Sequence, residues 1–327
     1  MKTTNDKLRR RPRIQGCGTA LVTPFQAGGR VDEEVFRALV RRQVAAGIHF
    51  LVPGGSTGEG VTLNRLEKVR VTELAVEAAD GAVPVIAGCG GNDTAEVVAL
   101  ARSLEGTGAA GLLVVTPYYN KPTPDGLFLH YTAVAEATCL PVVVYNVPSR
   151  TGVNVTAGTL ARLATIPGVA AVKEAAGDIM QMARMVEAVP SDFAVLSGDD
   201  AATLPAMALG AHGVISVVSN QIPGPMAELC DRCMAGDFAG ARGVHRRWLP
   251  LMDANFFETN PGPVKFAMAE MGLLEDRCRL PLSTVGPANQ RRVLEVMRSV
   301  GLVGSDHRQA RSPVSPAGGA RGRRTLS

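Results

Sequence analysis

Short apolar runs alternate with longer amphipathic stretches along most of this chain. The apolar runs are continuous, which is typical of parallel strands that are buried on both faces. The pattern predicts strands over residues 19–22, 50–52, 84–87, 111–115, 141–145, 169–173, 193–197 and 213–217. It predicts helices between them over residues 32–46, 66–79, 94–106, 126–137, 156–164 and 201–208.

This regular alternation predicts an α/β fold, a TIM (β/α)8 barrel over residues 16–223. Eight strand–helix units are the number that such a barrel needs. A doubly wound sheet is the alternative, but it rarely has eight such regular units and usually carries a glycine-rich phosphate turn. After the eighth strand the pattern indicates a C-terminal helical appendage over residues 224–303, with helices near 225–235, 239–254, 263–271 and 289–300.

The two ends of the chain carry its excess positive charge. The 327 residues have a net charge of +4, but residues 1–16 contribute +5 and residues 303–327 contribute +4, which leaves −5 for the body. A nucleic-acid-binding protein needs its basic surface on the folded part, so the charge pattern argues against this class. Residues 1–15 and 304–327 are predicted to be basic, disordered extensions.

The composition indicates a cytoplasmic globular protein. Hydrophobic residues make up 46% and charged residues 20% of the chain, which suits a substantial core. There is no apolar stretch long enough to span a bilayer and no signal-peptide h-region. Cys230 and Cys233 have no second pair to complete a zinc site, and the histidines show no metal spacing. Reduced thiols are the simplest account of the six cysteines.

Candidate chemistry gathers at the predicted strand ends, where TIM barrels carry their active sites. Lys173 ends an apolar run, and an amine held against apolar surface is more easily kept neutral, the form that attacks a carbonyl. Three of the four tyrosines, several hydroxyls and one arginine follow the other strands. A lysine among such groups is what a Schiff-base site for an oxo acid needs.

The roles of these residues follow from imine chemistry. Lys173 would attack the ketone, and Tyr145 would shuttle protons as the carbinolamine collapses. A phenol does this well only within a hydrogen-bond chain, which Ser56 and Tyr119 could supply.

Two groups are predicted to hold carboxylates. The turn at 56–57 offers backbone N–H groups, and Arg150 offers a guanidinium fork. Each motif also has a plainer interpretation. The glycines could make a tight turn, the tyrosines at 118–119 could pack at an oligomer contact, Arg150 could be a solvated charge, and Asp199-Asp200 could cap a helix. The combination of motifs favours catalysis.

Six segments resemble the dihydrodipicolinate synthase family, of the class I pyruvate aldolase superfamily that includes N-acetylneuraminate lyase. They are GGSTGEG (54–60), VTPYYNKP (115–122), YNVPSRTG (145–152), VKEAAGD (172–178), LSGDD (196–200) and GVISV (213–217). The resemblance implies condensation of pyruvate with L-aspartate 4-semialdehyde to 4-hydroxy-tetrahydrodipicolinate, the cyclic precursor of diaminopimelate and lysine. It also implies a homotetramer, a dimer of tight dimers, that needs no metal or organic cofactor.

By this resemblance Lys173 forms the Schiff base with pyruvate. Tyr145 and Ser56 look like members of a proton relay that Tyr119 of a neighbouring subunit completes. Thr57 would hold the carboxylate of pyruvate, and Arg150 that of aspartate semialdehyde. The substrate-binding residues implied are Thr57, Arg150, Gly55, Gly198 and Ile215.

Two features bear on the identity of the second substrate. The Ser-Arg-Thr-Gly turn around Arg150 is typical of the synthases, and sugar-acid lyases generally lack that arginine. In contrast, Ser56 stands where most synthases carry threonine, and serine is common there among the lyases. Another pyruvate-dependent aldolase or a 2-oxo-acid dehydratase is therefore the alternative, and a catalytically silent binding protein is a third.

A candidate regulatory site departs from the family pattern. Asn92, Glu96 and Tyr118 match the site at which lysine-inhibited members bind lysine. Arg65 and Lys68, however, occupy positions where those members often have histidine. Two fixed cations disfavour an incoming ammonium, so the sequence predicts weak or absent inhibition by lysine.

Overall fold

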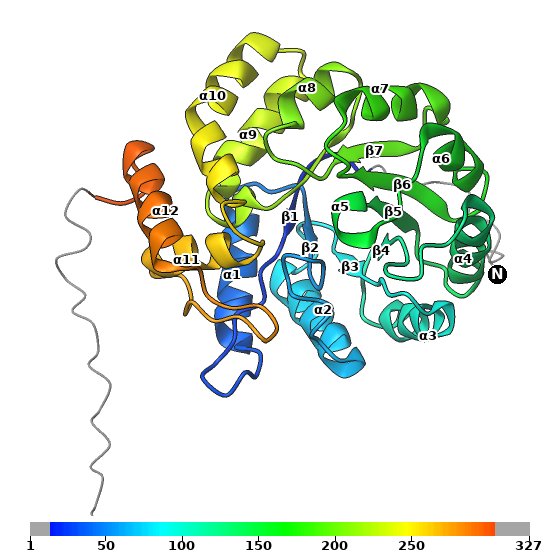
Figure 1. Ribbon diagram of the computed structural model, residues 1–327, viewed down its shortest axis with the longest axis horizontal. Coiled ribbons are helices and arrows are strands. Elements are labelled where there is room, and N and C mark those ends of the chain that lie inside the picture. Colours follow the sequence, from blue (N-terminus) through cyan, green and yellow to red (C-terminus); the bar gives the residue numbers. More distant parts are fainter. Residues whose placement is uncertain (1–13, 305–327) are drawn as a thin grey trace, which may run out of the picture.

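Eight parallel strands form one sheet in the computed structural model, which describes residues 14–304. Their order is β2-β1-β8-β7-β6-β5-β4-β3, and a parallel bridge between Leu51 and Val85 joins the two edges into a barrel (Figure 1). The strands are β1 (Gly16–Ala20), β2 (Phe50–Val52), β3 (Ile86–Gly88), β4 (Gly111–Val115), β5 (Val142–Asn146), β6 (Val169–Glu174), β7 (Ala194–Ser197) and β8 (Gly213–Ser216). The predicted (β/α)8 barrel is confirmed, and the doubly wound alternative is wrong.

Helices surround the barrel (Figure 1). Those up to the eighth strand are α1 (Glu33–Ala45), α2 (Arg65–Ala79), α3 (Thr94–Glu105), α4 (Pro124–Glu136), α5 (Pro148–Thr151), α6 (Ala157–Leu163), α7 (Ile179–Ala188) and α8 (Thr203–Ala208). A 3-10 turn, η2 (Val218–Asn220), then leads into α9 (Pro223–Met234), α10 (Phe238–Ala254), α11 (Gly262–Glu270) and α12 (Pro287–Ser299). The predicted ranges did not include α5 and α7. A single turn such as α5 is too short to show a helical period.

Side chains rather than an open channel fill the barrel. A Cβ atom on Gly18 would lie 2.0 Å from the Phe50 ring, so the glycine makes room for that ring. Ile14 is buried in the same interior cluster as Phe50 and Tyr145. Residues 14 and 15 therefore belong to the described fold, which corrects the predicted boundary of the N-terminal extension. Gly304, the first residue of the predicted C-terminal extension, is also described, whereas residues 1–13 and 305–327 lie outside the described part.

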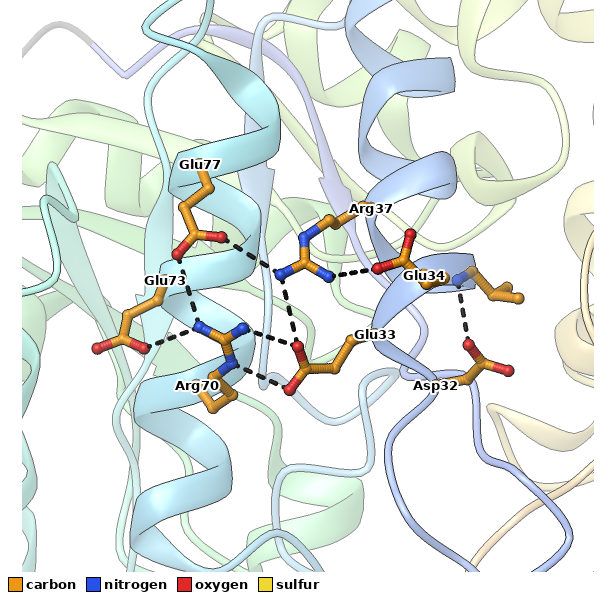
Figure 2. Close-up of polar contacts among 8 residues, drawn as sticks. Asp32, Glu33, Glu34, Arg37, Arg70, Glu73 and Glu77 are labelled. Atoms are coloured by element: carbon orange, nitrogen blue, oxygen red, sulfur yellow. Dashed lines mark hydrogen bonds and ion pairs between the residues drawn. The ribbon is translucent and has the colours of Figure 1, made fainter.

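A network of charged side chains joins α1 to α2 on the surface. Figure 2 shows Arg70 between Glu33, Glu73 and Glu77, with an Arg70 Nη2 to Glu33 Oε2 distance of 2.7 Å. Arg37 pairs with Glu33 and Glu77 as well. The Arg70 and Glu33 side chains are 40% and 39% exposed, and such pairs contribute about 0.2–1 kcal/mol each. The network therefore makes only a small contribution to the stability of the contact between α1 and α2.

The C-terminal helices share a hydrophobic core with the barrel. Phe36 of α1 belongs to the same buried cluster as Leu229 of α9, Trp248 of α10 and Met297 of α12. The appendage therefore extends the barrel core, and it lies beside α1 in Figure 1. Among residues 14–304, none of the helices combines the length and apolar character that crossing a bilayer requires.

Asp200 is a buried carboxylate that bonds to backbone amides far along the chain. Its Oδ2 accepts hydrogen bonds from the amides of Val217 at 3.0 Å and Val218 at 2.8 Å. Helix α8 begins after Ala202 without a side-chain cap, so Asp200 does not cap this helix as expected. Asp199 Oδ1 accepts the amide of Ala201 at 2.9 Å in the turn before the helix. Burial raises the pKa of Asp200 to about 6, although the two amides oppose that shift.

Replacing Asp200 with asparagine is expected to flatten the pH dependence of stability. Because the pKa of Asp200 is raised in the native state, the folded protein binds more protons than the unfolded chain between about pH 4 and pH 6. As the pH rises from about 4 to about 6, the free energy of unfolding of the wild type should therefore fall by about 2–3 kcal/mol relative to that of Asp200→Asn. Urea unfolding of both proteins from pH 4 to pH 7 measures this, and equal slopes would contradict it.

Candidate active site

Lys173 and Tyr145 lie side by side on neighbouring strands. The register of β5 on β6 pairs Tyr145 with Lys173 directly. The Lys173 Nζ lies 4.3 Å from the centroid of the Tyr145 ring, and the two residues are only 5% and 6% exposed. An amine and a phenol are thus held together at the carboxyl ends of two strands, as the sequence predicted from their separate motifs.

The next register pair fastens the same two strands together. Asn146 of β5 donates a hydrogen bond from Nδ2 to Glu174 Oε2 of β6 at 2.8 Å. The Ala176 amide donates to Glu174 Oε1 at 2.7 Å. Burial raises the pKa of Glu174. Because residues alternate between the two faces of a strand, this cluster anchors the strand ends from the face opposite to Lys173.

Gly198 makes room for the lysine. A Cβ atom at this position would lie 3.0 Å from Lys173 Cε and 2.6 Å from Ala175 Cβ. Any larger residue would displace the lysine stem or the backbone after β6. Gly198 therefore lies at the predicted site, where the absence of a side chain leaves space for Lys173.

The turn after β2 brings Ser56 and Thr57 to the same end of the barrel. It closes so tightly that a Cβ atom on Gly60 would lie 2.0 Å from the carbonyl oxygen of Gly54. Thr57 lines the same cleft as Lys173. Ser56 and Gly55 line an adjoining cavity, whose wall includes Tyr145. Tyr145 thus borders both the cleft that Thr57 lines and the cavity that Ser56 lines.

The cleft at Lys173 has a volume of about 220 Å³ and mixed polar and apolar walls. Its lining residues are Thr57, Tyr145, Val147, Ser149, Arg150, Lys173, Ala175, Gly198, Asp199, Val217, Phe256 and Asn260. The structure thus brings Lys173, Tyr145, Thr57, Arg150 and Gly198 together. Ile215 is fully buried in the interior cluster with Tyr145, and it is absent from the cleft wall.

Asn260 links the two predicted carboxylate-binding residues. Its Nδ2 donates to Thr57 Oγ1 at 3.0 Å, and its backbone oxygen accepts from Arg150 Nη2 at 3.2 Å. Asn260 precedes α11, about 200 residues beyond the turn that it contacts. Sequence reasoning did not assign it to the site, although it begins an Asn-Pro-Gly-Pro segment whose turn composition was a usable signal.

Tyr119 does not reach the cleft of its own chain. Its side chain is 89% exposed, and its backbone has a φ of 72°, in the left-handed region that non-glycine residues seldom adopt. The structure therefore separates it from Tyr145 and Ser56 within one chain, and its proposed place in the relay requires a second copy.

The five candidate regulatory residues line one groove. They are Arg65, Lys68, Asn92, Glu96 and Tyr118. Lys68 and Tyr118 also line the cavity that adjoins Ser56 and Tyr145, so the groove continues toward the active site. Burial lowers the pKa of Lys68. Among residues 14–304, no group of three or more His, Cys, Asp or Glu side chains is placed to hold a metal ion.

Comparison with known proteins gives one consistent result. The profile of the Dihydrodipicolinate synthetase family matches residues 13–300. The 4-hydroxy-tetrahydrodipicolinate synthase of Syntrophobacter fumaroxidans is 48% identical over 291 residues, which cover 89% of this chain and 100% of the relative. The synthase of Koribacter versatilis is 47% identical over 292 residues, which cover 89% of this chain and 97% of the relative.

Solved structures agree with these relatives. The dihydrodipicolinate synthase of Thermotoga maritima superposes with a TM-score of 0.87 at 45% identity, covering 89% of this chain and 100% of its own. A monomeric dihydrodipicolinate synthase variant superposes with a TM-score of 0.87 at 44% identity, covering 89% of this chain and 98% of its own.

Proposed function

This chain belongs to the dihydrodipicolinate synthetase family, and on that premise we propose that it condenses pyruvate with L-aspartate 4-semialdehyde to 4-hydroxy-tetrahydrodipicolinate. The product serves diaminopimelate and lysine biosynthesis, and the enzyme is a lyase of the aldolase type. The observation that carries the proposal is the buried contact of Lys173 with Tyr145, at 4.3 Å from amine to ring centroid.

The reaction begins with attack of Lys173 Nζ on the keto carbon of pyruvate. Loss of water from the carbinolamine gives an imine, and loss of a methyl proton gives an enamine. The enamine carbon then forms a bond to the aldehyde carbon of the semialdehyde. The amino group of the new adduct closes the ring on the imine carbon and releases Lys173.

Tyr145 is the proposed proton carrier for these steps, because it lies against the lysine. It adds a proton to the departing hydroxyl and accepts one from the methyl group. Ser56 lines a cavity whose wall also includes Tyr145, so it can continue a hydrogen-bond chain. We propose that Tyr119 of a second copy completes this chain, since its own side chain projects into solvent.

The cleft offers two sites for carboxylates. Thr57 Oγ1 accepts the hydrogen bond from Asn260, so its own hydrogen can be donated to the carboxylate of pyruvate. Arg150 lies at the exposed side of the cleft and can form a bidentate pair with the carboxylate of the semialdehyde. Asn260 contacts both residues and so sets their spacing.

The covalent imine supplies the electron sink that this chemistry needs, so we expect no metal ion or organic cofactor to take part. We also propose a homotetramer built from tight dimers, supported by the exposed Tyr119 and its left-handed backbone. One similar solved protein is a monomeric variant, so assembly is to be measured for this chain by sedimentation.

Borohydride trapping tests the proposed function. Purified protein is incubated with pyruvate and borohydride, with and without aspartate semialdehyde, and the adduct is mapped by mass spectrometry. A pyruvate-sized adduct on Lys173 that the semialdehyde diminishes is the expected result. If the semialdehyde leaves the amount of adduct unchanged, the protein is still a Schiff-base aldolase, but its second substrate is a different aldehyde or ketone. If no adduct forms at all, the proposal is contradicted.

Lysine is expected to inhibit this enzyme weakly or not at all. The groove holds two cationic side chains, Arg65 and Lys68, which repel the ammonium group of an effector. Initial rates measured against lysine concentration test this. The variant Arg65→His/Lys68→His is the matched comparison and should be more sensitive to lysine. Half-inhibition of the wild type at submillimolar lysine would contradict the prediction.

A further inference from the structure

We propose that the buried ion pair of Glu59 with Lys265 is a positioning device that holds the Ser56–Thr57 turn in the geometry that pyruvate binding requires. Glu59 follows Thr57 by two residues in the same turn, whereas Lys265 belongs to α11 of the C-terminal region. The inference rests on the proposed function, and it assigns a role to two charged residues that the reaction itself does not use.

The pair is completely enclosed and its polar groups are well partnered. Lys265 Nζ lies 2.5 Å from Glu59 Oε1, and both side chains are 0% exposed. The other carboxylate oxygen accepts the amide of Arg279 at 2.8 Å. The ammonium group also donates to the carbonyl oxygen of Arg277 at 2.6 Å and lies 4.4 Å from the centroid of the Phe25 ring.

Such a pair is a poor means of gaining stability alone. Removing two charges from water carries a large desolvation cost, and a well-packed apolar pair of similar volume is often as stable or more stable. What the ion pair adds is direction, because a short charge-assisted bond tolerates little displacement of either partner. Its position two residues from Thr57 indicates what it orients.

The backbone at Glu59 needs this kind of support. Its φ is 55°, in the left-handed region, so the conformation is unfavourable for a residue with a Cβ atom. The Glu59 amide donates to the carbonyl oxygen of Ser56 at 3.1 Å, and Gly60 donates to Gly55 at 3.0 Å. The conformation of Glu59 therefore determines how the turn closes on Ser56 and Thr57.

The C-terminal segment holds the turn through side chains at two residues, Thr57 and Glu59. Asn260 contacts Thr57, and five residues later Lys265 contacts Glu59. Two contacts in parallel fix the rotation of the turn as well as its distance from α11. If the ion pair is lost, only the neutral hydrogen bonds from Asn260 to Thr57 and from the Arg279 amide to residue 59 remain, and the Thr57 hydroxyl should be aimed less steadily at the cleft of Lys173.

The test removes the charges while preserving volume and fold. Glu59→Gln/Lys265→Met replaces the pair by neutral side chains of similar size. Glu59→Gln alone keeps the volume and an acceptor oxygen for Lys265 but removes the counter-charge of its ammonium group. Glu33→Gln, in the surface network of Figure 2, is the control for loss of a charge far from the cleft. Each full-length protein is titrated with pyruvate, trapped with borohydride and analysed for the Lys173 adduct and thermal unfolding.

The double variant is expected to need about tenfold more pyruvate for half-maximal trapping, since small displacements of binding groups have effects of at least this size. Glu59→Gln should need about threefold more. The KM for the semialdehyde should change by less than about twofold in both, because Arg150 does not belong to the turn. Glu33→Gln should match the wild type in its response to pyruvate and lose only a little stability, because its ion pairs are at the surface.

A purely structural role gives a different pattern. It would lower the melting temperature while the folded molecules keep the wild-type response to pyruvate, and that result would overturn the inference and leave the proposed function intact. If the double variant does not fold, Glu59→Gln decides the matter by the same criterion. Absence of a Lys173 adduct in the wild type would overturn the proposed function and this inference together.

Discussion

Lys173→Arg is expected to abolish the pyruvate adduct and to lower kcat/KM by at least about 10⁴-fold, as removal of a covalent nucleophile does in other enzymes. Arginine is a long basic side chain of similar size, placed at a position that is only 5% exposed. Its guanidinium remains protonated and cannot form the imine. Trapping with borohydride and a product assay measure both effects.

The control for this experiment is Lys121→Arg, which makes the same substitution at an exposed lysine outside the cleft wall. It should retain the Lys173 adduct and wild-type turnover. Thermal unfolding of Lys173→Arg shows whether the barrel has survived the change. A folded Lys173→Arg protein that still turns over near the wild-type rate would refute the Schiff-base mechanism at this residue.

Tyr145→Phe is expected to lower kcat by about 10²–10³-fold, the range found when a general acid–base group is removed. Phenylalanine keeps the ring that lies 4.3 Å from Lys173 Nζ and loses only the hydroxyl. Pyruvate should therefore still reach the lysine, while carbinolamine collapse and enamine formation become slow. The adduct should form to a similar final extent but at a lower rate.

Quenching with borohydride at successive times separates these effects. The matched control is Tyr131→Phe, because Tyr131 is buried behind the strands and donates its hydroxyl to the Val114 carbonyl oxygen. That variant should lose stability without a specific change in the rate of adduct formation. Equal rates of adduct formation in Tyr145→Phe and the wild type would remove Tyr145 from the proton transfers.

Sequence reasoning succeeded where the information is local. Continuous apolar runs mark strands covered on both faces, so the eight strands and the position of Lys173 at the end of one could be predicted. Because β5 and β6 are consecutive, their strand ends meet, and Tyr145 lies beside Lys173 as the motifs suggested. The glycines at 54, 55 and 58 likewise predicted the tight turn that the structure contains.

Contacts between distant segments could not be predicted in this way. The bonds of Asn260 to Thr57 and of Lys265 to Glu59 join residues about 200 positions apart, and no periodicity records such a pairing. Asp200 was expected to cap a helix from its local sequence, yet it binds the amides at Val217 and Val218. Local pattern cannot choose among partners that only tertiary packing brings near.

The sequence by itself thus determined the barrel, the order of its elements and the chemical groups at its strand ends. Tertiary structure alone decided which groups share the cleft of Lys173, that Tyr119 points away from it, and that α11 reaches back to the turn after β2. The physical reason is that burial and hydrogen bonding within one element depend on neighbours along the chain. The geometry of a site depends on how several elements pack together.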